Sequence, residues 1–311
     1  MLPSFRLPSQ LRLPLIGAPR ATGGGVTSGP GGTQSVQVDY RDRISVATWI
    51  VMFGLATSVL LDVPTFVLSF TALGSPMSIP LGETTLAAFL MAVVAAAGAE
   101  SVVAVHPRFV TARESRTRTW AFWALPMAIV IIAVLLLPQA PNRLAQVIVL
   151  LSSGGLIALA FFSLYATVEP GQPGYRRSRL LLDALAYGAA LLLFLFVYRT
   201  RTRSLLSGSL IAATAMLLAV ELLRASTDRV SLAASYGFVV GLVLGQVTWA
   251  LNYWLLSDLT GGLFLLLIFY LLTGIAQQGL QQRLNRRVLI EFGAFAAMAL
   301  LLIAVVGPRF G

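Results

Sequence analysis

The chain has 311 residues, of which 57% are hydrophobic and 11% are charged, and its mean hydropathy is +0.84. Soluble domains carry about 25% charged residues, so this composition excludes a soluble globular protein and indicates lipid as the main solvent. The net charge of +10 comes from 22 basic residues, all arginine. They stand mostly in short clusters between apolar runs, which excludes a nucleic-acid-binding surface. Because the chain has no cysteine, disulfides and thiolate catalysis are excluded as well.

Residues 1–40 are predicted to be a flexible, basic tail rich in proline and glycine. Its prolines interrupt the apolar stretches, so it lacks the run of about 7 to 15 apolar residues that is typical of a signal peptide. The tail arginines could attract an anionic lipid surface, and a solvated tail without function is the alternative. The following residues, 41–311, are predicted to form one transmembrane helical domain.

Nine apolar runs follow, and most approach the roughly 20 residues that a helix needs to cross the hydrocarbon layer. The runs cover approximately 44–70, 84–106, 120–137, 144–167, 180–198, 205–223, 231–256, 260–277 and 288–306. The sequence therefore predicts an all-α, polytopic integral membrane helix bundle of about nine transmembrane helices. Proline disfavours a continuous helix through Asp62-Val63-Pro64. The first run is thus expected either to kink there or to end near Leu61, with the next residues at the membrane interface.

The distribution of arginine predicts the orientation of these helices. If the N-terminus is cytoplasmic, 17 of the 22 arginines fall in inner segments and 5 in outer ones. Such an excess is typical of the cytoplasmic side of membrane proteins. We therefore expect a multi-pass protein of the bacterial cytoplasmic (inner) membrane, with its C-terminus outside. Arginines 199–203 are the one discordant cluster, and a re-entrant helix pair beside them is an alternative.

The seventh run carries two polar patterns. Gly237, Gly241 and Gly245 recur every fourth residue, which is typical of close helix–helix packing in lipid. Thr248 and Asn252 roughly continue the same winding stripe, and Gln246 is a further amide past the middle of the run that needs a hydrogen-bond partner. Packing against a neighbouring helix is the ordinary explanation of this stripe. A cavity lined by the three polar side chains is the functional alternative, which makes them candidates for a solute path.

Acidic residues inside membrane helices are costly and are functional candidates for that reason. Glu100 follows a run of small residues near the inner end of its helix, and His106 comes six residues later. A buried carboxyl there could carry protons, with His106 as a relay. The alternative is a carboxyl paired with an arginine. Glu221 precedes Arg224 by three positions, which favours an ion pair on one helix face.

The chain lacks the short motifs of several enzyme classes, since it has no HExxH, GxSxG, Walker A or GxGxxG pattern. With one histidine, no multi-histidine metal or haem site can form. No cofactor or metal is predicted, and an enzyme is disfavoured. Two functions remain open: a small-solute or proton-coupled permease, and a non-catalytic membrane scaffold or subunit. The expected partners are the lipid bilayer and a second copy or a membrane complex, without nucleic acid.

Overall fold

The computed structural model of the chain describes residues 31–60, 64, 66–72, 75–111, 115–169, 171–172, 174–200, 204–227, 229–253 and 257–306. Within these residues the chain forms ten α-helices, two short 3₁₀ helices and one β-hairpin. The α-helices are α1 (Gly31–Ser58), α2 (Glu83–Val103), α3 (Pro107–Thr111), α4 (Ala124–Leu136), α5 (Arg143–Ala166), α6 (Tyr175–Thr200), α7 (Ser204–Leu223), α8 (Val230–Leu251), α9 (Asp258–Leu280) and α10 (Arg286–Val306). The 3₁₀ helices η1 (Ser115–Phe122) and η2 (Leu137–Gln139) flank α4.

Six helical segments of the described chain are long and apolar enough to cross a membrane. They are α2, α5, α8, α9, most of α6, and the segment Thr119–Gln139 that contains α4. In α7, Ser207–Leu223 is also apolar but is shorter than these segments. The expected helical membrane fold is therefore confirmed at this coarser level. A long helix also occupies each of the other predicted runs, with α1 and α10 at the two ends of the series.

Of the two alternatives for the first predicted run, 44–70, a helix that ends near Leu61 agrees with the structure, and a helix that continues to residue 70 is wrong. The helix α1 ends at Ser58, and Phe66–Ala72 form the strand β1, which pairs antiparallel with β2 (Ser75–Leu81). The prolines explain why this segment is not helical, because Pro64, Pro76 and Pro80 cannot donate the backbone hydrogen bonds of a helix interior. In the hairpin, Val67 is the partner of Pro80 and Thr71 the partner of Pro76.

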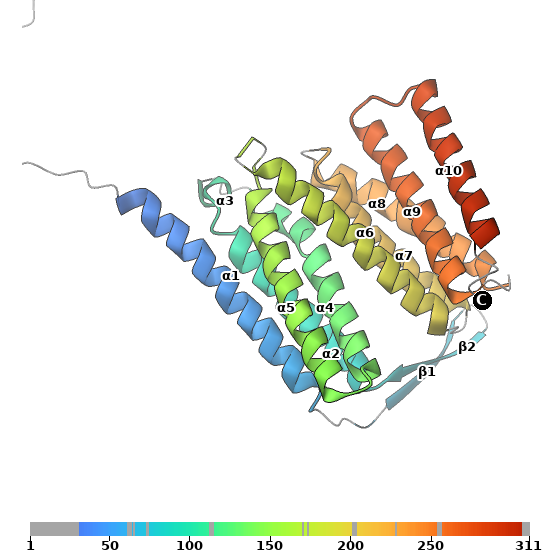
Figure 1. Ribbon diagram of the computed structural model, residues 1–311, viewed down its shortest axis with the longest axis horizontal. Helices are drawn as coiled ribbons and strands as arrows, with labels where there is room; N and C mark the ends of the chain where they lie inside the picture. Colours follow the sequence, from blue (N-terminus) through green and yellow to red (C-terminus); the bar gives the residue numbers. More distant parts are fainter. Residues whose placement is uncertain are drawn as a thin grey trace, which may run out of the picture.

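The start of α1 also differs from the predicted boundary of the tail. The helix begins at Gly31 and not after residue 40, while residues 1–30 lie outside the described part of the chain. Figure 1 shows α1 at one edge of the bundle and α10 at the opposite edge, with the hairpin across one end. We call this the hairpin end. The other end, where α5, α7 and α9 finish and α6, α8 and α10 begin, is called the arginine-rich end.

The interior of the bundle is filled by aromatic and aliphatic side chains from the central helices. Phe161, Phe194 and Phe269 are fully buried, and the rings of the last two pack edge to face with centroids 5.6 Å apart. Two alanines of α2, Ala95 and Ala99, have no exposed surface. Small side chains let helices approach closely, which is how helices associate in lipid, where little hydrophobic drive exists between them. This packing positions the polar groups described next.

Candidate functional site

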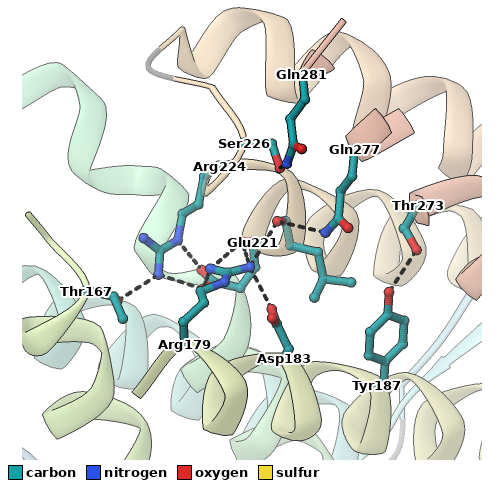
Figure 2. A network of polar contacts seen from close by, with 11 residues as sticks. Thr167, Arg179, Asp183, Tyr187, Glu221, Arg224, Ser226, Thr273, Gln277 and Gln281 are labelled. Atoms are coloured by element: carbon teal, nitrogen blue, oxygen red, sulfur yellow. Dashed lines mark hydrogen bonds and ion pairs between the residues drawn. The ribbon is translucent and has the colours of Figure 1, made fainter. Parts of the chain in front are cut away.

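A group of charged side chains lies at the arginine-rich end, at the last turn of α7 (Figure 2). Glu221 has no exposed surface. The guanidinium of Arg224 donates to both of its carboxylate oxygens, from Nη2 at 2.7 Å and from Nε at 2.9 Å. Such a two-point contact is the strongest geometry for an arginine–carboxylate pair. The ion pair predicted from the spacing of these two residues is therefore confirmed.

A second arginine reaches the same carboxylate from α6. Nη1 of Arg179 lies 3.8 Å from Glu221, and Nη2 lies 2.7 Å from Asp183, one turn further along α6. The same guanidinium donates to the backbone carbonyl of Leu222 at 2.9 Å. This carbonyl belongs to the end of a helix, where the backbone has no helical donor and carries partial negative charge. Arg179 thus serves as counter-ion and as helix cap at once.

The charges of this group balance. Two arginines face two acids, and the side chain of Arg224 is only 8% exposed. Its guanidinium lies 4.1 Å from the centre of the Phe122 ring and 3.4 Å from the hydroxyl of Thr167. Buried charges need this degree of pairing, because each would otherwise lose its hydration without compensation. We call Thr167, Arg179, Asp183, Glu221 and Arg224 the arginine network.

Further polar contacts join the arginine network to α9. The side-chain amide of Gln277 donates to the carbonyl of Leu222 at 3.4 Å. One turn deeper, the hydroxyl groups of Tyr187 and Thr273 lie 3.1 Å apart, and Thr273 has no exposed surface. Figure 2 shows these residues in a row between α6, α7 and α9. Polar groups therefore continue from the arginine network into the interior of the bundle.

His106 is buried beside the loop that joins α5 to α6, with 2% of its surface exposed. Its Nδ1 accepts from the backbone N–H of Arg108, and its Nε2 lies 3.1 Å from the side-chain amide of Gln172. Burial lowers the pKa of His106 below its ordinary value, against the opposing effect of Glu169. The ring also meets Tyr165 edge to face. This environment favours the neutral form of the imidazole.

Glu100 lies in another environment than the expected one. Its Oε2 accepts a hydrogen bond from the indole Nε1–H of Trp123 at 3.0 Å, and the carboxyl is partly buried. The hydrogen-bond partner of the Glu100 carboxyl is thus the indole of Trp123, whereas the ion-pair alternative expected an arginine. No described contact joins Glu100 to His106, although both belong to the same end of α2. The proposed relay between them remains a prediction.

The three polar residues of α8 do not face a common space. Gln246 is exposed on the outer surface of the bundle, and Thr248 is buried with its hydroxyl donating to Leu244 of its own helix. Asn252 donates to the hydroxyl of Ser207, near the start of α7, at 2.8 Å. The winding of the helix accounts for the difference, because Gln246 and Thr248 are about 200° apart around its axis. A cavity lined by all three would require a different arrangement of α8.

Gly237, Gly241 and Gly245 contact α7 along its whole length. A Cβ atom at Gly241 would lie 2.5 Å from the carbonyl oxygen of Ala212, and one at Gly245 would lie 3.0 Å from that of Gly208. The glycine stripe therefore forms a seam inside this chain. It is not available for contact with a second chain.

One feature of this site could not be expected from the sequence pattern. Arg179 and Glu221 are 42 positions apart, so only the packing of α6 on α7 brings them together. A separate pair outside the arginine network, Asp39 and Asp42, stands at the DxxD spacing that magnesium-binding enzymes use, and this spacing is visible in the sequence itself. Among the described residues, however, no three His, Cys, Asp or Glu side chains gather as a metal site would require.

These observations define a class: a multi-pass helical membrane protein with a buried, charge-balanced network at one end of its bundle. The chain belongs to the family described as "Protein of unknown function (DUF5656)", whose model matches residues 63–306. Comparison with curated proteins and with solved structures gives no match. The matched region contains the hairpin, α2 to α10 and the complete arginine network.

Proposed function

We propose that this protein is a proton-coupled, permease-like carrier of a small solute in the bacterial inner membrane. In this proposal the chain crosses the membrane about nine times, with the N-terminus and the arginine-rich end facing the cytoplasm. The observation that supports it is the position of Glu221, a fully buried carboxylate held between arginines of α6 and α7. Ionisable groups buried inside a membrane helix bundle are functional candidates by default.

Protonation supplies a simple coupling step. A proton on Asp183 or Glu221 removes one negative charge from the balanced network, which leaves an arginine without its full counter-charge. The side chain of Asp183 is 32% exposed and that of Glu221 is 0% exposed, so a proton from water reaches Asp183 first. The ion pairs by which Arg179 joins α6 to the end of α7 are then weaker. Rearrangement of these two helices would convert a proton into movement.

Reconstitution into liposomes tests this proposal. A panel of labelled amino acids, sugars and nucleosides is offered to proteoliposomes under an inside-alkaline pH gradient, with a trapped pH dye reporting proton entry. We expect one class of solute to accumulate together with protons. Asp183→Asn should abolish gradient-driven accumulation and retain exchange of the same solute at equal pH. Glu291→Gln, which changes an exposed pair on α10, is the matched control.

Failure would be plain in either of two ways. Accumulation by Asp183→Asn at the rate of the native chain would remove the network from the coupling step. No uptake and no proton entry with any solute of the panel would contradict the carrier itself. Glu100→Gln belongs in the same assay, because Glu100 is the second carboxyl candidate on a proton path.

A non-catalytic subunit of a membrane complex is the second candidate. It is favoured by α10, which lies at the edge of the bundle against α9 (Figure 1) and exposes Ile290, Met298 and Leu301. A partner helix would cover such a face. Because the glycine stripe is used within the chain, we expect Met298→Arg on α10 to abolish co-purification of a partner. Co-purification that persists in this variant would exclude α10 as the contact.

A further inference from the structure

A groove with a volume of about 460 Å³ lies between α1 and α2, away from the arginine network. Its size falls within the range of sites for small ligands, which is about 300 to 1,000 Å³. Nine residues line it: Asp42, Arg43, Val46, Ala47, Ile50, Val94, Ala97, Gly98 and Ser101. The walls are aliphatic, and the charged residues are confined to one end.

The polarity of the groove changes along its length. From Asp42 to Ile50 the helix α1 rises about 12 Å at 1.5 Å per residue, and Val94 on the antiparallel α2 lies toward the same apolar end. Asp42, Arg43 and Ser101 form the polar end. A ligand that fits must therefore have a charged head and an aliphatic body several carbon atoms long.

The groove opens on the outer surface of the bundle, where Val46, Ile50 and Ala97 are exposed. At hydrocarbon depth a peptide in extended form is a poor occupant, since its backbone groups would find no hydrogen-bond partners there. A lipid chain has no such groups and gains dispersion contacts along the aliphatic walls. The occupant that matches the surroundings is thus a membrane lipid.

We propose that this groove binds one phospholipid with a zwitterionic phosphoethanolamine headgroup. Arg43 contacts the phosphate, and the carboxylate of Asp42 accepts hydrogen bonds from the ammonium group, while one acyl chain lies along Val46, Ile50 and Val94. The two opposite charges stand side by side in the sequence and both line the groove. A phosphoglycerol headgroup carries the same phosphate but no ammonium group, so the carboxylate of Asp42 would stand beside the phosphate without a cation from the lipid, which is unfavourable. A choline headgroup has no N–H to donate to the carboxylate.

Lipid binding to the purified full chain tests this site. The delipidated protein in detergent is titrated with phosphatidylethanolamine, phosphatidylcholine or phosphatidylglycerol of equal chain length, and bound lipid is counted by native mass spectrometry. We expect one tight site that prefers the ethanolamine lipid. Ala97→Trp fills the groove and should weaken this binding by roughly tenfold, about 1.4 kcal/mol. Ala297→Trp, on the exposed face of α10, should leave it unchanged.

Two variants of the residues that contact the headgroup provide a second test if the tryptophan variant misfolds. Asp42→Asn should remove the preference for ethanolamine over glycerol headgroups, and Arg43→Gln should weaken binding of all three lipids. The proposal is overturned if Ala97→Trp and Ala297→Trp bind the ethanolamine lipid equally. It is also overturned if the native chain binds phosphatidylglycerol more tightly than phosphatidylethanolamine. Neither result depends on solute uptake, so the test of this lipid site is independent of the test of the carrier function.

Discussion

The guanidinium of Arg179 lies 3.8 Å from the carboxylate of Glu221 and joins α6 to the end of α7. Arg224, directly after the end of α7, approaches the same carboxylate to 2.7 Å. A carboxylate without exposed surface thus depends on two cations from two helices. Each cation is itself mostly buried, so loss of either leaves uncompensated charge inside the protein.

Arg224→Met is expected to destabilise the protein strongly. Removal of one partner of a buried ion pair costs about 3 to 5 kcal/mol, because the remaining charge is buried without its counter-ion. Thermal unfolding in detergent measures this as a fall in Tm. Arg287→Met is the control, since Arg287 and its partner Glu291 are 87% and 64% exposed and such pairs contribute little. Equal Tm values for the two variants would contradict the buried position of Glu221.

Gly241→Leu is expected to force α7 and α8 apart. A side chain at this position meets the backbone carbonyl of Ala212, and overpacking of this kind costs about 1 to 3 kcal/mol or more. Gly155→Leu on α5 is matched to it, because open space surrounds Gly155 among the described residues. Only the Gly241 variant should lower the Tm. The oligomeric state should not change, since the seam lies within one chain, and a change would count against this assignment.

Trp123→Phe is expected to lower the free energy of unfolding, because it removes the hydrogen bond to Glu100. The phenyl ring keeps most of the apolar contact and removes the N–H donor, and hydrogen bonds to charged groups contribute about 1.5 to 3 kcal/mol. A double-mutant cycle with Glu100→Gln isolates the coupling energy in unfolding measurements. Coupling near zero would show that Glu100 finds another partner in the membrane.

His106 is expected to make stability depend on pH. Burial lowers its pKa, so the unfolded chain takes up a proton near the ordinary value of about 6.5 before the folded chain does. The contribution of His106 is therefore complete above this pH and is lost as the pH falls below it. Nearby Glu169 opposes the shift, while Arg108 reinforces it. The Tm of His106→Gln should fall less between pH 7.5 and 5.5 than that of the native chain.

Asn252→Leu and Gln246→Leu separate a structural amide from an exposed one. The side chain of Asn252 donates a hydrogen bond to Ser207 near the beginning of α7. Its loss should lower the free energy of unfolding by about 1 kcal/mol, which is observed as a fall in Tm. Gln246 is exposed and has no described hydrogen-bond partner, so Gln246→Leu should be neutral or stabilising in detergent. If both variants instead abolish solute uptake without loss of stability, the polar stripe of α8 acts as a solute path.

The sequence predicted the helices well because their apolar runs and arginine boundaries are local signals. The ion pair Glu221–Arg224 could be predicted for the same reason, since residues three positions apart on a helix have their side chains on one face. The hairpin at 66–81 was missed because short apolar runs do not distinguish a strand from a helix. Prolines at positions 64, 76 and 80 were the available signal for that segment.

Contacts between distant helices were not accessible from one sequence. Arg179 could be placed near Asp183 by spacing, but its contact with Glu221 depends on how α6 packs on α7. The partner of Glu100 was expected to be an arginine, and the short helix η1 brings Trp123 there instead. Gln246, Thr248 and Asn252 were grouped as candidates because they are polar and close in sequence, but the rotation of about 100° per residue turns Gln246 away from Thr248.

The seam between α7 and α8 has a consequence for how the chain enters the bilayer during synthesis. The apolar part of α7 is short and carries Glu221 in its last turn, so this helix partitions into the bilayer by itself less favourably than a full-length span. The next helix follows after a short loop and fits against it at the glycines. Nascent chains that stop before Val230 should therefore leave α7 incompletely inserted, and chains extended through Leu251 should insert both as a helical hairpin.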